Sequence, residues 1–176
     1  MKIFATLLLV LVLGTAFTGC DSSGSTPESI VDATTPAGWT RKNNYPMGPG
    51  VAADFVLFAP TVGNYTDNVE VLTSPTSGIP VATAADELVQ QALSSSEISN
   101  VVVDSNTAHS VAGLPGQLIQ VEFSIVVNGT TFQIVQRQLL AVHSGKDIQI
   151  LFNRQASNLA RADEFRQVEA SLKIGG

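Results

Sequence analysis

From Ile119 to Ile134 the chain reads IQVEFSIVVNGTTFQI, and this segment is the most informative one about its architecture. Up to Val127, apolar side chains occupy every second position and alternate with polar ones, Gln120, Glu122 and Ser124. This period of two is typical of an antiparallel strand with one buried and one solvated face. We therefore expect a long half-buried strand here.

The Asn128-Gly129 pair that follows is a strong hairpin signal, because both residues accept the positive φ of a type I′ turn. A two-residue loop at this point brings apolar residues opposite one another, Ile125 with Phe132 and Phe123 with Ile134. Turn chemistry and register agree, so the sequence predicts a β-hairpin with one apolar face.

Further strands are expected on both sides of this hairpin. A second hairpin through 143–147 should return Ile148, Ile150 and Phe152 to the same face as the first. Before the hairpin, 113–116 should form a turn, and 100–111 is a candidate strand interrupted by the polar residues 104–106. Two earlier strands are predicted at 53–60 and 68–73.

Two amphipathic helices are predicted. The first begins near Thr83, which can cap it, and carries one apolar stripe, Ala85, Leu88, Val89, Ala92 and Leu93. The second runs from about Ser157 to Leu172, with Phe165, Val168 and Leu172 facing the core. Asp163 and Glu164 place favourable negative charge near its start.

Residues 1–19 have the character of a lipoprotein signal peptide, with Lys2 before an apolar run that is shorter than the roughly 20 residues of a membrane-spanning helix. Phe17-Thr18-Gly19-Cys20 resembles a lipobox, although Phe17 stands where such boxes usually have Leu. We expect cleavage before Cys20 and acylation of its sulfur, which anchors the chain to a membrane. The alternative is an ordinary secretory signal that leaves Cys20 free.

The remainder divides into a tether and one domain. Residues 20–37 hold the lipidated Cys20 and a small, polar, turn-forming segment that reads as flexible. Residues 38–176 are expected to form a single domain, with Trp39, the only tryptophan, in its core.

Charge and cysteine content exclude several functions. Nine basic residues stand against fifteen acidic ones, which gives a formal charge of −6. Such a surface does not attract nucleic acid. Because Cys20 is the only cysteine, the chain has no intramolecular disulfide and no thiolate metal cluster.

No motif in the chain carries a reaction. His109 and His143 lie outside any His-rich or His-Glu motif, and each is expected at the surface near a strand end. Gly48-Pro49-Gly50 precedes a predicted strand, so it reads as a turn and not as a dinucleotide fingerprint. We expect no catalytic residue, no metal and no cofactor.

The order of motifs resembles that of the PsbP/Mog-type fold, and within it the DcrB- and LpqN-type bacterial envelope lipoproteins. The resemblance rests on motifs spread over the chain: Pro36-x-Gly38-Trp39, Asn68-Val69-x-Val71, Gly113-x-Pro115-Gly116 and Phe165-x-x-Val168-x-x-Ser171-Leu172. It implies an α+β domain: an antiparallel β-sheet of about six strands, a meander in the C-terminal half, and helices packed on the sheet. It brings no shared catalytic residues.

Three functions follow as hypotheses. The first is a non-catalytic module, lipid-anchored in the bacterial envelope, that binds a protein or envelope component. Its place would be the outer face of the cytoplasmic membrane or the periplasm, or else the outer membrane. The others are a carrier of a small apolar ligand and a hydrolase. A deep apolar cavity would favour the carrier, and a pocket rimmed by His109 or His143 with a carboxylate would favour the hydrolase.

Overall fold

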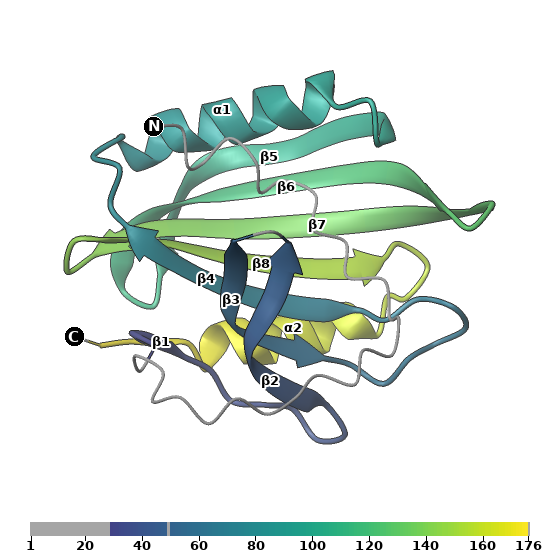
Figure 1. Ribbon diagram of the computed structural model, residues 1–176, viewed down its shortest axis with the longest axis horizontal. Coiled ribbons are helices and arrows are strands. Elements are labelled where there is room, and N and C mark those ends of the chain that lie inside the picture. Colours follow the sequence, from purple (N-terminus) through teal and green to yellow (C-terminus); the bar gives the residue numbers. More distant parts are fainter. Residues whose placement is uncertain (1–28, 49, 176) are drawn as a thin grey trace.

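The computed structural model describes residues 29–48 and 50–175. Over these residues the chain is α+β, as expected, with a seven-stranded antiparallel sheet in the order β2-β3-β4-β8-β7-β6-β5 and a two-stranded sheet, β1-β9 (Figure 1). The elements are β1 (Val31–Asp32), β2 (Thr40–Gly48), β3 (Val51–Phe58), β4 (Asn68–Pro75), α1 (Val81–Ser94), β5 (Ser99–Val111), β6 (Leu114–Val127), β7 (Thr130–His143), β8 (Lys146–Gln155), α2 (Arg161–Ala170) and β9 (Lys173–Ile174). The strand count therefore exceeds the expected six.

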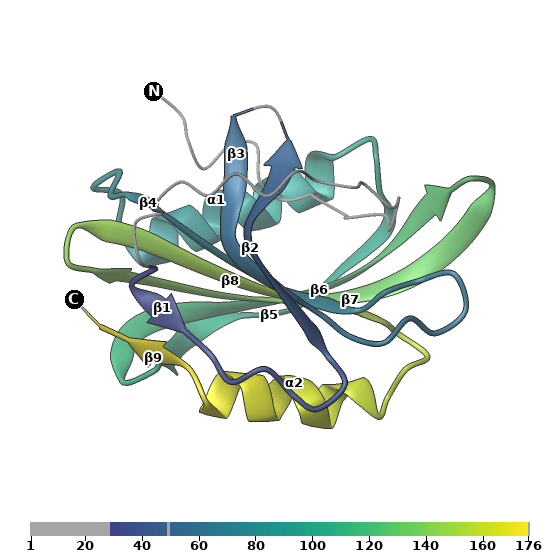
Figure 2. The same cartoon turned by 60° about the horizontal axis from the view of Figure 1, so that its bottom comes forward.

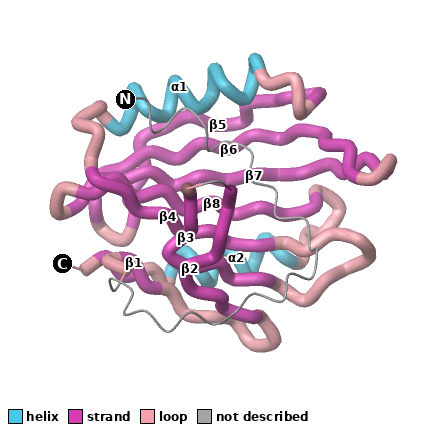
Figure 3. The backbone as a smooth tube through the Cα atoms, in the orientation of Figure 1, coloured by secondary structure: helices cyan, strands magenta, loops and turns pink. Residues whose placement is uncertain are grey.

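The two helices cover opposite faces of the large sheet (Figure 2). Helix α1 packs on β5, β6 and β7, whereas α2 packs on β8. Each face has its own hydrophobic core, one around Phe123 and Leu88 under α1 and one around Phe152 and Phe165 under α2. The tube view shows the β2–β3 hairpin crossing the other strands at a steep angle (Figure 3). Its far end buries Met47 against Leu72 and Leu151.

The predicted β6–β7 hairpin is confirmed. Asn128 and Gly129 have φ values of +49° and +78°. Ile125 pairs with Phe132 and Phe123 pairs with Ile134, so the register follows from the turn. These four side chains belong to the core beneath α1.

The second hairpin also forms, but its strand faces the other way from the prediction. The turn at Ser144-Gly145 pairs Ala141 with Ile148 and Leu139 with Ile150. Those residues of β7 alternate with the ones that face α1, so Ile148, Ile150 and Phe152 lie under α2. The expectation of a single shared face was wrong because the sheet is buried on both sides.

The turn before β6 lies at Ala112-Gly113 and not over 113–116. Both residues have positive φ, so they form the two-residue loop themselves, and Pro115 and Gly116 belong to β6. The predicted interruption of β5 at 104–106 is a register shift between Val103 and Ser105 within one continuous strand.

Both predicted helices exist with different boundaries. Helix α1 starts at Val81, after Pro80, without a side-chain cap, so Thr83 does not cap it. Its predicted stripe is buried except for Leu93, which is 52% exposed. Helix α2 starts at Arg161 and not near Ser157, and Asp163 and Glu164 do lie in its first turn.

The folded part begins before Gly38, which corrects the expected boundary of the tether. Val31 and Asp32 form β1 and pair with Ile174 and Lys173 of β9. Val31 and Ala33 are buried in the core beneath α2, and Trp39 joins them there as predicted. The rest of the expected tether, and the whole signal segment, lie outside the described residues.

Among residues 29–48 and 50–175, no helix has the length and apolar character needed to cross a bilayer.

Candidate functional site

A groove of about 480 Å³ lies between α2 and the strands beside it. Its walls come from four elements, β6, β7, β8 and α2, and the lining residues are Leu118, Gln120, Val135, Arg137, Phe152, Arg154, Ala162, Phe165, Arg166 and Glu169. This volume falls within the roughly 300–1,000 Å³ of small-molecule sites. We call it the α2 groove.

The α2 groove is basic in an acidic chain. Three arginines, Arg137, Arg154 and Arg166, line it with a single carboxylate, Glu169. Arg137 forms a two-pronged ion pair with Glu169. Arg166 pairs with Asp163 at the exposed surface of α2, where such pairs are weak.

Arg154 has no carboxylate partner among the described residues; its recorded acceptors are backbone carbonyls. Its Nη1 donates to the carbonyl of Ala156 at 3.0 Å and to that of Gln155 at 3.4 Å. These bonds hold the guanidinium at the end of β8 and leave its charge uncompensated.

His109 joins the ion pair at one end of the groove. Its Nε2 lies 3.0 Å from Oε1 of Glu169, and its side chain is 31% exposed. The expectation of an ordinary surface histidine was therefore incomplete. This contact meets one part of the hydrolase criterion, but the groove-lining residues include no hydroxyl or thiol that His109 could activate.

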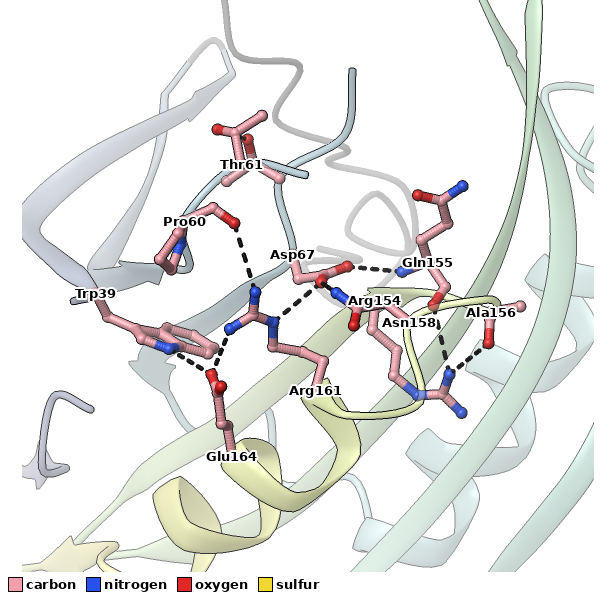
Figure 4. A network of polar contacts seen from close by, with 11 residues as sticks. Trp39, Pro60, Thr61, Asp67, Arg154, Gln155, Ala156, Asn158, Arg161 and Glu164 are labelled. Carbon is pink, nitrogen blue, oxygen red and sulfur yellow. Dashed lines mark hydrogen bonds and ion pairs between the residues drawn. The ribbon is translucent and has the colours of Figure 1, made fainter. Parts of the chain in front are cut away.

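A buried polar network fixes the start of α2, and with it one wall of the groove (Figure 4). Nε of Arg161 donates to Asp67 at 3.1 Å, and both side chains are buried. Asp67 also accepts from Asn158 at 2.6 Å, and Trp39 Nε1 donates to Glu164 at 2.7 Å. A buried charge left without its partner is costly, so these contacts hold the helix in one position.

The α1 face of the sheet holds a second polar feature, a row of amides that we call the amide row. Gln149 donates to Gln138 at 2.9 Å, Gln138 to Gln136 at 2.7 Å, and Gln136 to Asn153 at 2.8 Å. Asn153 then donates to Glu70 at 3.2 Å.

Glu70 places a carboxyl at the end of the amide row, and it is 2% exposed. Burial raises the pKa of its carboxyl to about 8, although the hydrogen bonds from Asn68 and Asn153 favour the ionised form. The carboxyl is therefore largely protonated at neutral pH, and it acts as a structural group because the side chain is enclosed. The sequence pattern had shown Glu70 only as the polar face of a strand.

The remaining predicted site residues are dispersed. His143 ends β7 at the second hairpin, as expected, and Ser144-Gly145 is a hairpin tip. Cys20 lies outside the described residues. Within the described ranges, no group of three or more His, Cys, Asp or Glu side chains is placed to hold a metal ion.

Comparison with solved structures identifies the architecture. The structure of LpqN of Mycobacterium tuberculosis, described as involved in cell envelope biogenesis, superimposes with a TM-score of 0.64 at 14% identity, over 86% of this chain and 87% of LpqN. The solution structure of PsbP from the cyanobacterium Synechocystis superimposes with a TM-score of 0.50 at 13% identity, over 87% of this chain and 97% of that protein. The chain has the PsbP/LpqN-like fold.

With the PsbP/LpqN-like fold established, the resemblance read from the sequence is confirmed at the level of fold. Neither protein-family models nor curated proteins give a match to the chain. At these identities the likeness carries no site residues across, so the chemistry has to be argued from the groove itself.

The α2 groove combines cationic and apolar side chains. Its cationic and apolar walls suit a ligand with an anionic and an apolar part, and its arginines suit planar oxyanions. It is not the purely apolar cavity that would favour a carrier of apolar ligands.

Proposed function

We propose that this chain is a lipid-anchored protein of the bacterial cell envelope that binds a protein or an envelope component without catalysing a reaction. The α2 groove is the observation that carries the binding role: it is open, has about 480 Å³ of space, and is lined by cationic and apolar groups without a hydroxyl or thiol. The likeness to LpqN, a protein described as involved in cell envelope biogenesis, supports the envelope setting.

The anchor rests on the sequence. Lys2, the apolar run after it and the lipobox ending at Cys20 are the features of a lipoprotein signal. Two or three acyl chains on Cys20 would hold the protein firmly, because each buried CH₂ contributes about 0.8 kcal/mol. The acidic surface gives an anionic bilayer no electrostatic attraction, so the lipid is the sole anchor in this proposal.

Labelling with a palmitate analogue in the native host tests the anchor. The wild-type chain should take up label and sediment with membranes, whereas Cys20→Ala should take up none and leave the membrane fraction. Ser25→Ala is the control for a substitution in the same segment and should be labelled normally. Labelled Cys20→Ala protein would refute the lipoprotein assignment.

Crosslinking in cells tests the binding role. A photoreactive residue in place of Gln120, in the groove wall, should capture a specific partner, whereas one in place of the exposed Glu97, outside the groove lining, should not. Equal capture at both positions would contradict a role for the groove.

A hydrolase is the second candidate, and the contact of His109 with Glu169 beside the groove is the one observation that favours it. Against it, Glu169 is already held by Arg137, and the groove lining offers no hydroxyl or thiol nucleophile. Loss of biological activity in a well-folded His109→Gln variant would favour the hydrolase.

A further inference from the structure

The charge of the α2 groove is the starting point. The chain carries fifteen acidic and nine basic residues, yet three arginines and one glutamate line this groove. A cleft with low-dielectric walls that is lined mainly by charge of one sign concentrates ligands of the opposite sign. The groove is therefore a local attractor for anions on a protein that repels them elsewhere.

Arg154 and Arg166 supply the charge that is available to a ligand. Glu169 neutralises Arg137, so that arginine is committed within the protein. Among the described residues, Arg166 pairs with the exposed Asp163 alone, a contact that a ligand can replace at little cost. Within residues 29–48 and 50–175, Arg154 is held through Nη1, so its Nε and Nη2 remain as donors for an oxyanion.

The guanidinium of Arg154 is also pre-positioned. Two backbone carbonyls at the end of β8 fix its Nη1, and little side-chain freedom is then lost when an anion binds. A guanidinium fork matches the spacing of phosphate and carboxylate oxygens, which favours these heads over a neutral sugar.

The rest of the groove is apolar. Phe152 and Phe165 line it with their ring centroids 5.4 Å apart, and Leu118 and Val135 line it from the strands. An occupant that filled the groove would place an apolar chain or ring on these side chains. Burial of such a group contributes roughly 25 cal/mol per Å².

We propose that the α2 groove binds a small anionic amphiphile, whose phosphate or carboxylate head contacts Arg154 and Arg166 and whose apolar part lies against Phe152 and Phe165. The proposal names a ligand class for the binding role proposed above and rests on it. A small ligand is favoured over an acidic protein because a stable protein interface covers about 800 Å² per partner, whereas the groove has the volume of a small-molecule site.

Surface plasmon resonance with water-soluble probes tests the head and the tail separately. The full chain is captured through a C-terminal tag and washed free of detergent, so the measurement does not depend on acylation. Hexyl phosphate should bind, hexyl glucoside and inorganic phosphate should bind more weakly, and Arg154→Gln should weaken hexyl phosphate about tenfold or more.

Arg41→Gln is the matched control, because it removes the same charge from an arginine outside the groove lining. It should leave the affinity for hexyl phosphate unchanged, and unfolding midpoints should show that both variants are folded. Equal binding of hexyl phosphate by wild type and Arg154→Gln would overturn the proposal. So would equal binding of hexyl phosphate and hexyl glucoside.

Vesicles of phosphatidylcholine with and without phosphatidylglycerol distinguish the possible sources of the head group. Retention of phosphatidylglycerol vesicles that depends on Arg154 supports a membrane lipid, and binding of hexyl phosphate alone supports a soluble anionic amphiphile. An acidic peptide that binds where hexyl phosphate does not would overturn the proposal in favour of a protein partner. If hexyl phosphate fails to bind while Cys20 is labelled normally and the Gln120 position crosslinks a partner, the binding role stands and its ligand is a different one.

Discussion

Glu70→Gln should make the protein more stable at alkaline pH and remove part of its pH dependence. The carboxyl is enclosed at the end of the amide row, and burial raises its pKa from 4.5 to about 8. Glutamine has nearly the same shape, and its side-chain oxygen can still accept the bond from Asn153. The substitution therefore removes the titration with little change in packing.

The proton on Glu70 determines whether stability rises or falls with pH. The folded protein keeps the proton on Glu70 up to about pH 8, whereas the unfolded chain loses it near the ordinary pKa of 4.5. Folding therefore takes up a proton between these values, and stability falls as the pH rises through this window. The loss is about 1.4 kcal/mol for each pH unit and ends near pH 8, where Glu70 ionises in the folded protein too. Raising the pH from 6 to 9 therefore costs the wild type about 2 to 3 kcal/mol at this site.

Urea unfolding followed by Trp39 fluorescence measures the effect at pH 6 and at pH 9. The free energy of unfolding of Glu70→Gln, relative to wild type, should rise by about 2 to 3 kcal/mol between the two pH values. Glu97→Gln, the same change at an exposed position, should show no such rise. A parallel response of Glu70→Gln and wild type would refute the assignment of a neutral, enclosed carboxyl.

The further predictions concern a turn glycine, a strand glycine, metal binding and the histidines. Gly129→Val should destabilise the protein by more than about 1 kcal/mol, because a β-branched residue is strained at φ +78°; an unchanged denaturant midpoint would contradict the turn assignment. Gly116→Ala should cost roughly 1–3 kcal/mol, since its Cβ would lie 2.3 Å from the carbonyl oxygen of Leu140. Gly175→Ala meets no atom within 4 Å and should leave the midpoint unchanged, so equal effects of the two alanines would refute the packing argument. The full chain should bind no stoichiometric transition metal by elemental analysis, and the double variant His109→Gln, His143→Gln should complement a deletion strain; failure to do so with normal folding and abundance would promote the hydrolase.

Local signals account for the parts of the fold that the sequence predicts well. The β6–β7 hairpin could be predicted because Asn128-Gly129 and the alternation before it fix turn and register together. The face of β8 could not be predicted in the same way. Ile134 and Leu139 lie on opposite faces of β7, and only tertiary packing on both sides reveals that each face is buried.

Polar strand residues and short strands explain the larger errors. Gln136 and Gln138 look like solvent-facing residues, but they are 3% and 0% exposed because the amide row satisfies their hydrogen bonds. The sequence does not reveal strand β1, because two residues carry no periodicity and its partner lies at the other end of the domain.

The α2 groove was beyond sequence reasoning for a related reason. Arg137, Arg154 and Glu169 come from three separate elements, and no spacing along the chain brings them together. The absence of a motif for chemistry was visible in the sequence, whereas the concentration of positive charge became visible only in the folded chain.

The pairing of β1 with β9 has a consequence for synthesis. Ribosomes synthesise the chain from its N-terminus, so Val31 has no strand partner until Ile174, near the end of the domain, has been made. Contacts between distant parts of a chain form slowly because a long loop must close first. The two-stranded sheet should therefore form last and complete the burial of the core beneath α2. A nascent chain halted before Lys173 should expose Val31 to proteases, whereas Val31 is buried in the finished protein.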